Sequence, residues 1–221
     1  KEHGLDIGLS TDFKLLDQTA AWLLVRQNLD KFNLDYYRPL GNPTKFIRAL
    51  LSHFSHCKDE AISSEDYLKY ADDIKRNFDD GVFVSKAGNR EEKISQKEAE
   101  AEQQRIQEIA NAYHIYQRML LENNALDFGD LINYCLKLFQ KRPAILNKYQ
   151  EQFKYILVDE FQDTNWAQYE LVKLLAAPSN NITVSFDDDQ SLYRWRGASL
   201  SNILNFKNDY PKSKEVILVY N

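Results

Sequence analysis

The stretch that decides the fold is Lys154-Tyr-Ile-Leu-Val-Asp-Glu160, in which a short apolar run ends abruptly in two acidic residues. A second stretch has the same form, because the apolar residues of 181–186 lead into Asp187-Asp-Asp189. A third apolar run covers residues 216–219, and helical patterns lie between the runs. Near-continuous apolar strands that alternate with helices indicate a parallel α/β sheet covered on both faces. Both acidic groups then fall at carboxyl ends of strands, where such sheets gather their functional groups.

The residues before these runs predict helices, because apolar residues recur at three- and four-residue spacing from Leu5 to about Leu146. Thr44 is the expected N-cap of one helix, and Ser63 with Asp66 resembles a capping box that opens the next. The apolar stripes of both helices are expected to be core; they comprise Phe46, Ile47, Leu50, Leu51 and Phe54, then Tyr67, Leu68, Ala71 and Ile74.

A long charged helix is expected to begin near Glu91, with a first part that is polar on almost every side. Asn123-Asn124 interrupts its pattern, and a further helix follows until the step Arg142-Pro143, where proline disfavours helix in the preceding residue. The sequence therefore predicts a mostly helical region followed by an α/β region.

Composition excludes several classes of protein. The 221 residues are 43% hydrophobic and 28% charged, and no apolar run approaches the roughly 18 residues of a membrane span. The net charge of −5 argues against an overall electrostatic clamp on nucleic acid, so any such contact is expected to be local. Cys57 and Cys135 lack the spacing of a zinc site or a disulfide framework, which fits the reducing cytoplasm.

The acidic pair Asp159-Glu160 is a candidate for metal-assisted chemistry. A carboxylate at a strand tip can hold Mg²⁺, directly or through water, and its neighbour can orient an attacking water. Acidic residues also accumulate at helix N-termini because they complement the helix dipole. The pair alone favours this second interpretation, and its position after a buried strand favours the first.

The segment Asp187–Ala198 changes from three acids to arginines interleaved with aromatic residues, in the order Tyr193, Arg194, Trp195 and Arg196. Aromatic rings can stack on bases while neighbouring cations contact phosphates. Protein interfaces use the same residue types, so composition alone leaves both interpretations open.

Two of these segments resemble motifs of superfamily 1 DNA helicases of the UvrD/Rep/PcrA family. Val158-Asp-Glu-Phe-Gln-Asp-Thr164 resembles motif II, the Walker B motif, and Asp187-Asp-Asp-Gln-Ser-Leu-Tyr-Arg-Trp-Arg-Gly-Ala198 resembles motif III. Leu126-Asp-Phe-Gly-Asp-Leu131 is similar to the segment by which the family's helical insertion returns to the first motor domain. Val216-Ile-Leu-Val-Tyr-Asn221 is similar to the beginning of motif IV. The resemblance is specific from Leu126 onward and looser before it.

The resemblance implies a mostly helical subdomain at residues 1–125, followed at 126–221 by the C-terminal half of a RecA-like parallel-sheet motor domain. It further implies an internal piece of a longer helicase, since the chain begins without Met and has no Gly-Lys step of a phosphate-binding loop. The intact parent is expected to be an ATP-dependent helicase, and the isolated chain is expected to be inactive in ATP hydrolysis. No signal peptide is visible at residues 1–13.

The resemblance also implies roles for individual residues in a motor that couples ATP hydrolysis to movement on DNA. Asp159 would bind Mg²⁺, Glu160 would position the hydrolytic water, and Gln190 would contact the γ-phosphate of ATP. Contacts with the DNA strand are implied for Tyr193, Trp195 and Arg196. The implied cofactors are ATP and Mg²⁺, and the implied partners are single-stranded DNA or single-strand/duplex junctions, with no membrane.

Three further residues surround the implied site. Gln162 and Asp163 are expected to support the Asp159-Glu160 pair, and Asp163 is equally able to cap the following helix. Phe186 stands where the family has glycine, so a bulky ring is expected to alter the packing at this strand end.

Two other functions remain open from the residues. A metal-dependent nuclease could use Asp159, Glu160 and Asp187–Asp189 as a two-metal site, although it gives no reason for Gln190, Tyr193 and Trp195. A non-catalytic module that binds DNA or protein is the third possibility.

Overall fold

A computed structural model describes residues 1–221 except 82–83, 88–89, 94, 188–199 and 218–221. The chain forms two compact units, Lys1–Leu131 and Ile132–Asn221. Helices occur together with short parallel pairs of strands, so the fold is mixed α/β, as the sequence predicts. The assignment of 1–125 to a helical insertion and of 126–221 to a motor domain stays a prediction. Within the described ranges, every helix is too short or too polar to cross a membrane.

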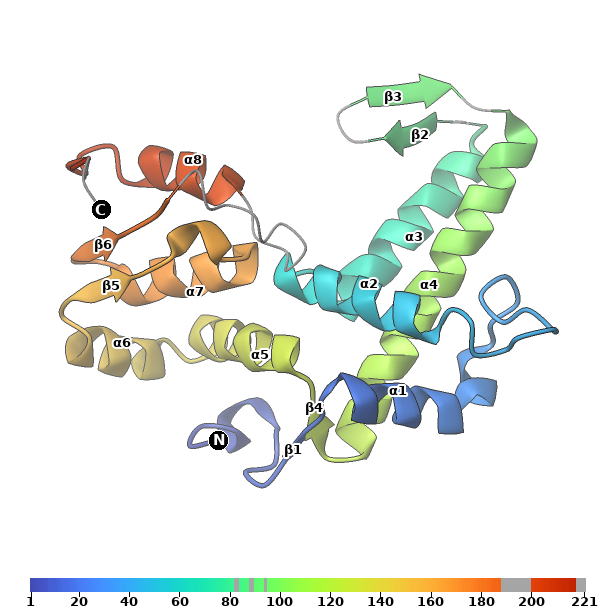
Figure 1. Ribbon diagram of the computed structural model, residues 1–221, viewed down its shortest axis with the longest axis horizontal. Coiled ribbons are helices and arrows are strands. Elements are labelled where there is room, and N and C mark those ends of the chain that lie inside the picture. The colour runs from blue at the N-terminus through green and yellow to red at the C-terminus, as the bar shows by residue number, and fades with distance from the viewer. Residues whose placement is uncertain (82–83, 88–89, 94, 188–199, 218–221) are drawn as a thin grey trace. The chain divides into compact units, whose positions relative to one another are not determined.

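The first unit is built mainly from helices. Figure 1 shows α3 and α4 side by side, with the β2–β3 hairpin beyond one end of the pair. Strand β1 pairs in parallel with β4, and β2 pairs antiparallel with β3. The elements are η1 (Leu5–Ile7), β1 (Lys14–Leu15), α1 (Gln18–Gln27), η2 (Leu29–Phe32), α2 (Ile47–Asp59), α3 (Ser64–Asp79), β2 (Val84–Ala87), β3 (Arg90–Lys93), α4 (Gln96–Glu122) and β4 (Ala125–Leu126).

Stacked aromatic rings form part of the core of this unit. The ring of Phe54 stacks against Tyr113 and Tyr116, with centroid separations of 5.0 and 5.5 Å. Ile47 and Leu50 of the predicted stripe are buried beside Phe54, which confirms that α2 turns this face inward. Burying an aliphatic or aromatic side chain contributes about 1.5–3 kcal/mol, so this contact of α2 with α4 is a main source of stability.

The helix start predicted at Ser63 is confirmed and the one predicted at Thr44 is wrong. Ser63 caps α3, because its hydroxyl accepts a hydrogen bond from the backbone N–H of Asp66 at 3.1 Å. Helix α2 begins only at Ile47 and has no side-chain cap. The Thr44 hydroxyl instead donates to the Asn42 side chain at 3.2 Å, so it is engaged in the preceding turn.

The charged helix expected from Glu91 begins later. Residues Arg90–Lys93 form β3, which pairs with β2 in a hairpin. Helix α4 starts at Gln96, after a capping box in which Ser95 and Glu98 hydrogen-bond each other's backbone N–H groups. This reciprocal cap satisfies two N–H groups that would otherwise lack partners, and it sets the helix start. The predicted end at Asn123-Asn124 is confirmed.

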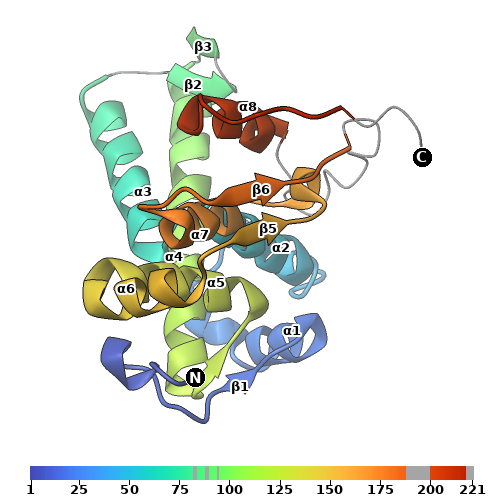
Figure 2. The same ribbon diagram turned by 90° about the vertical axis from the view of Figure 1, so that its left-hand side faces the viewer.

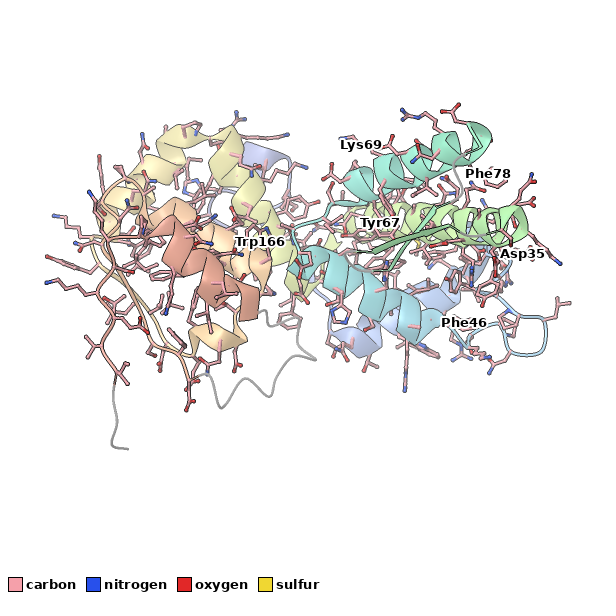
Figure 3. The ribbon with its side chains drawn as sticks, turned by 90° about the horizontal axis from the view of Figure 1, so that it is seen from above. Asp35, Phe46, Tyr67, Lys69, Phe78 and Trp166 are labelled. Atoms are coloured by element: carbon pink, nitrogen blue, oxygen red, sulfur yellow. The ribbon has the colours of Figure 1, made fainter. Side chains whose placement is uncertain are left out.

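A carboxylate of α4 organises the loop between η2 and α2. The backbone N–H groups of Asp35, Tyr36 and Tyr37 donate to the Glu108 carboxylate at 2.8, 3.2 and 3.0 Å. Asp35 and Phe46, near the two ends of this loop, are labelled in Figure 3. Hydrogen bonds to an ionised acceptor are among the stronger ones in proteins, so Glu108 fixes the path of the loop.

Helix α5 (Phe128–Lys141) starts beside a buried ion cluster made by Lys58, Asp127 and Asp130. The Lys58 amine lies 2.6 Å from the Asp127 carboxylate and 2.8 Å from that of Asp130. Burial raises the pKa of the Asp130 carboxyl above its usual value. Tyr116 and Gln117 donate hydrogen bonds to the same two carboxylates.

The second unit contains the predicted strand–helix–strand arrangement. Strands β5 and β6 pair in parallel, and α7 connects them. Helix α5 ends at Lys141 and α6 begins at Pro143, which confirms the predicted break. After α5, the elements are α6 (Pro143–Gln152), β5 (Ile156–Val158), η3 (Phe161–Asp163), α7 (Trp166–Ala176), β6 (Ile182–Val184) and α8 (Leu200–Asp209).

The described residues cover the sheet of this unit on one face only. Val158 and Val184 pack with Phe161, Tyr169 and Phe206 in an apolar core. Figure 2 shows α7 behind the two strands, and on the opposite face the Leu157 side chain is 79% exposed. The predicted cover on both faces is therefore wrong for the described residues, since α7 and α8 contribute their apolar residues to the single core.

The third predicted strand, at residues 216–219, is not confirmed. Val216 and Ile217 belong to no strand, and residues 218–219 lie outside the described part of the chain. Val216 and Ile217 are 79% and 78% exposed, so neither packs into the core that β5 and β6 share.

Candidate functional site

The acidic pair follows β5 directly, at the carboxyl ends of both strands. The N–H of Ser185 donates to the Val158 carbonyl, and the N–H of Phe161 donates to the Ser185 carbonyl, each at 2.9 Å. These two bonds bracket Asp159 and Glu160, which form an exposed turn between them. Carboxylates at this edge of a parallel sheet are placed where ligands bind in open α/β folds.

The backbone of Glu160 is strained. Its φ of +52° lies in the left-handed region, which non-glycine residues adopt at a cost of roughly 1–3 kcal/mol. The bonds at Phe161 and Ser185 hold this conformation from both sides. Such strain accumulates at functional sites, because a rigid surrounding structure must offset it.

The side chain of Asp159 is exposed and has a neutral partner. The Ser185 hydroxyl, at the end of β6, donates a hydrogen bond to one Asp159 carboxylate oxygen. A hydroxyl donor orients this carboxylate without neutralising its charge. The charge of Asp159 therefore remains available to a cation.

Gln162 joins the two strand ends. Its side-chain Nε2 donates to Glu160 Oε2 at 2.5 Å, and its Oε1 accepts from the backbone N–H of Asp187 at 3.1 Å. The Gln162 side chain is only 2% exposed, and both of its hydrogen bonds are partly buried. The expectation that Gln162 supports the acidic pair thus has a direct contact behind it.

Asp163 does not cap the following helix. Asn165 is the N-cap of α7, in a capping box with Gln168. Asp163 Oδ1 is buried and accepts no hydrogen bond from the residues that the structure describes. The helix begins two residues later than the alternative interpretation of Asp163 required.

Sequence reasoning missed two residues at this site, Ser185 and Asn202. Asn202 of α8 is fully buried, and its Nδ2 donates to the Thr164 carbonyl at 3.0 Å. Phe206, one turn further along α8, packs edge-on against Phe161 with ring centroids 5.6 Å apart. A polar residue four positions before Phe206, on the same face of α8, was the available signal for Asn202.

The structure describes the segment Asp187–Ala198 only in part. Asp187 lies at the site, and Phe186 before it is 39% exposed, outside the apolar core of the described residues. Asp188 and Asp189 lie outside the described residues, as do four predicted site residues: Gln190, Tyr193, Trp195 and Arg196. Their roles stay predictions.

The donor set fits Mg²⁺ bound together with a nucleotide. In the described ranges, no group of three or more His, Cys, Asp or Glu side chains could hold a metal ion. Mg²⁺ in phosphoryl-transfer sites typically uses one or two carboxylates and completes its shell with phosphate oxygens and water. The exposed Asp159 carboxylate meets that need, whereas a two-metal nuclease site gains no support from this part of the chain.

The fold and the acidic turn define a mixed α/β protein that presents carboxylates at the carboxyl ends of parallel strands. The chain belongs to the UvrD/Rep helicase family, because the family model described as the UvrD/REP helicase N-terminal domain matches residues 1–211.

Individual relatives support the same family. An ATP-dependent DNA helicase PcrA from Leuconostoc citreum is 36% identical over the whole of this chain. The proteins of that name from Staphylococcus epidermidis strain RP62A and Bacillus subtilis strain 168 are 43% and 37% identical, each over 97% of this chain. The chain spans about a quarter of the length of these relatives, since 24–25% of each is covered.

Proposed function

We propose that this chain is part of an ATP-dependent DNA helicase that couples ATP hydrolysis to movement along single-stranded DNA. The observation that carries the proposal is the exposed Asp159-Glu160 turn, braced by Ser185 and Gln162 at the ends of two parallel strands. Membership of the UvrD/Rep family supports it, as do relatives named ATP-dependent DNA helicases.

The two carboxylates divide the chemistry between them. Asp159, oriented by the Ser185 hydroxyl, holds Mg²⁺, which when bound offsets the negative charge of the phosphates. Glu160 orients the attacking water and accepts its proton. The Nε2 of Gln162 donates to Glu160 Oε2. Glu160 Oε1 has no hydrogen-bond donor among the described residues, so this second oxygen faces the water.

The residues after Asp187 supply the remaining contacts of the proposal. Gln190 contacts the γ-phosphate, and Trp195, only five residues further on, contacts the DNA strand together with Tyr193 and Arg196. Stacking of a base on an aromatic ring is tolerant of sequence, which suits movement along single-stranded DNA or a single-strand/duplex junction. A short segment between phosphate and base provides a direct route for coupling.

ATP hydrolysis by the full-length protein tests the proposal. Glu160→Gln keeps the size of the side chain but removes the charge that activates water, so DNA-stimulated hydrolysis should fall about 10²–10⁴-fold while nucleotide and DNA still bind. The matched control is Glu170→Gln, a carboxylate of α7 that pairs with Lys173 outside the site, which should keep its activity. Undiminished hydrolysis by Glu160→Gln contradicts the proposal.

Magnesium separates the two carboxylates. Asp159→Asn weakens the hold on Mg²⁺, so its loss of rate should be partly recovered at high magnesium concentration. Added metal cannot replace a carboxylate that positions water, so Glu160→Gln should stay inactive in the same titration. If magnesium rescues Glu160→Gln and not Asp159→Asn, the two roles are assigned the wrong way round.

A further inference from the structure

The side-chain amide of Gln162 can adopt only one orientation in this site. The Glu160 carboxylate, when ionised, only accepts hydrogen bonds, and the backbone N–H of Asp187 only donates. The Nε2 of Gln162 must therefore face Glu160, and its Oε1 must face Asp187, as observed at 2.5 and 3.1 Å.

We propose that Gln162 is a positioning residue that makes the orientation of the Glu160 carboxylate depend on the backbone at Asp187. This inference rests on the proposed function of Glu160 in ATP hydrolysis. Asp187 lies three residues after the end of β6 and three residues before Gln190. A shift of the backbone at Asp187 therefore pulls on the Gln162 amide. The hydrogen bond from the amide to Glu160 Oε2 then lengthens or shortens, and the Glu160 carboxylate, including the oxygen that faces the water, rotates with it.

The local structure makes this coupling direct. Glu160 and Gln162 belong to one tight turn, in which the N–H of Asp163 donates to the Glu160 carbonyl at 2.9 Å. The N–H of Phe161 bonds to Ser185, so the turn is anchored to the end of β6 by its backbone. Among the described contacts, the Gln162 amide is the one link between Asp187, beyond the end of β6, and the Glu160 side chain. The backbone anchors hold the turn, and the amide sets the carboxylate.

Methionine substitution tests the link in the full-length protein. Gln162→Met fills similar space but cannot hydrogen-bond, so kcat for DNA-stimulated ATP hydrolysis should fall about 10- to 100-fold, with the KM for ATP changed less than about twofold. Gln168→Met is the control, because Gln168 is a glutamine of the same unit whose described hydrogen bonds complete the capping box of α7. The control should lower thermal stability and leave kcat unchanged.

A second readout does not depend on activity. The Asp187 amide proton should exchange with solvent at least about tenfold faster in nucleotide-free Gln162→Met than in the wild type, because its acceptor is gone. Should the methionine variant fail to fold, Gln162→Asn carries the test. Its amide is one methylene shorter and cannot reach both Glu160 and Asp187, so the same loss of kcat and of protection is expected.

A double-mutant cycle distinguishes positioning from general support. Adding Gln162→Met to Glu160→Gln should lower the single-turnover rate of ATP hydrolysis by less than about twofold, because the carboxylate that Gln162 positions is already lost. The inference is overturned if the rate loss of the double variant is the product of the losses of the two single variants. It is also overturned if Gln162→Met keeps the kcat of the wild type. The proposed function fails separately, if the wild-type protein shows no DNA-stimulated hydrolysis or if Glu160→Gln retains it.

Discussion

Two acidic segments of this chain occupy the same local position in two different units. Asp127 directly follows β4 and Asp159 directly follows β5, and each strand pairs in parallel with one neighbour. Asp127 and Asp130 share the buried amine of Lys58. Asp159 and Glu160 are exposed, and their partners are the hydroxyl of Ser185 and the amide of Gln162.

The difference lies in what neutralises the negative charge. A buried carboxylate requires a cation or several donors within the protein, because it has lost its solvation by water. Lys58 supplies that cation within the protein, so the two carboxylates of the first cluster already share a partner and need no external cation. Neutral partners orient the second pair and leave its charge for an external cation. The position of acids after a strand therefore indicates a site only where the protein supplies no cation of its own.

The largest effect is expected from removing the buried cation. Lys58→Met leaves the buried Asp130 and the partly buried Asp127 without their cation, and breaking a buried pair in this way costs about 3–5 kcal/mol of unfolding free energy. Urea unfolding of the chain measures the loss. Glu160→Gln, at the exposed pair, should change the same free energy by less than about 0.5 kcal/mol.

The pH dependence of this loss has a definite sign. Burial already raises the pKa of Asp130 in the folded chain, and removal of Lys58 raises it further. A carboxyl whose pKa is higher in the folded state favours folding as the pH falls, so the deficit of Lys58→Met should shrink from pH 8 to pH 5. Lys69→Met removes an exposed amine paired with Asp66 and serves as the control. An equal loss of unfolding free energy in Lys58→Met and Lys69→Met would contradict the distinction between a buried and an exposed charge.

A smaller effect should follow from crowding the buried cluster. A Cβ at Gly129 would lie 2.8 Å from Lys58 Cβ and 2.9 Å from Lys58 Cδ, closer than side chains pack. Gly129→Ala should therefore destabilise the chain by about 1–3 kcal/mol, measured by urea unfolding. At Gly41 nothing lies within 4 Å of an added Cβ, so Gly41→Ala should be neutral or slightly stabilising. Equal stability of the two alanine variants would show that Lys58 can move aside.

Local patterns predicted what depends on neighbours in sequence. The capping of α3 by Ser63 and the turn of Asp159-Glu160 after a parallel strand both follow from residues within a few positions of each other. The β2–β3 hairpin was missed because Arg90-Glu-Glu-Lys93 has good intrinsic helix propensity, and strand pairing overrode it.

Long-range partners could not be predicted. Lys58 is buried beside the carboxylate of Asp127, 69 positions further along the chain, and lysine is almost never buried without such a partner. Gln162 was a candidate from its place beside the acidic pair, but its second partner, Asp187, lies 25 positions further along the chain. A separation along the chain does not measure a distance in space, so only the structure reveals that the amide joins the two strand ends.

The smallest effect concerns a third carboxylate, Asp209, whose environment is intermediate between the two segments. The Tyr169 hydroxyl donates to Asp209 at 2.7 Å and the Lys173 amine lies 3.3 Å away, while the Asp209 side chain is 39% exposed. The hydrogen bond from Tyr169 is the main reason that the pKa of Asp209 lies below its usual value, and Lys173 adds to it.

Tyr169→Phe should cost about 0.5–1.5 kcal/mol of unfolding free energy at pH 7, because it removes one hydrogen bond to a charged but partly solvated group. A carboxyl with a lowered pKa stabilises the folded state above its ordinary pKa, and that contribution disappears as the pH falls through the lowered value. The gap between wild type and Tyr169→Phe should therefore narrow below about pH 4, when urea unfolding is followed from pH 7 to pH 3. Tyr155→Phe, at a tyrosine that is 74% exposed, should match the wild type at every pH. A difference that widens in acid would contradict this interpretation. It would mean that the Tyr169 hydroxyl stabilises the folded chain without needing the negative charge of Asp209.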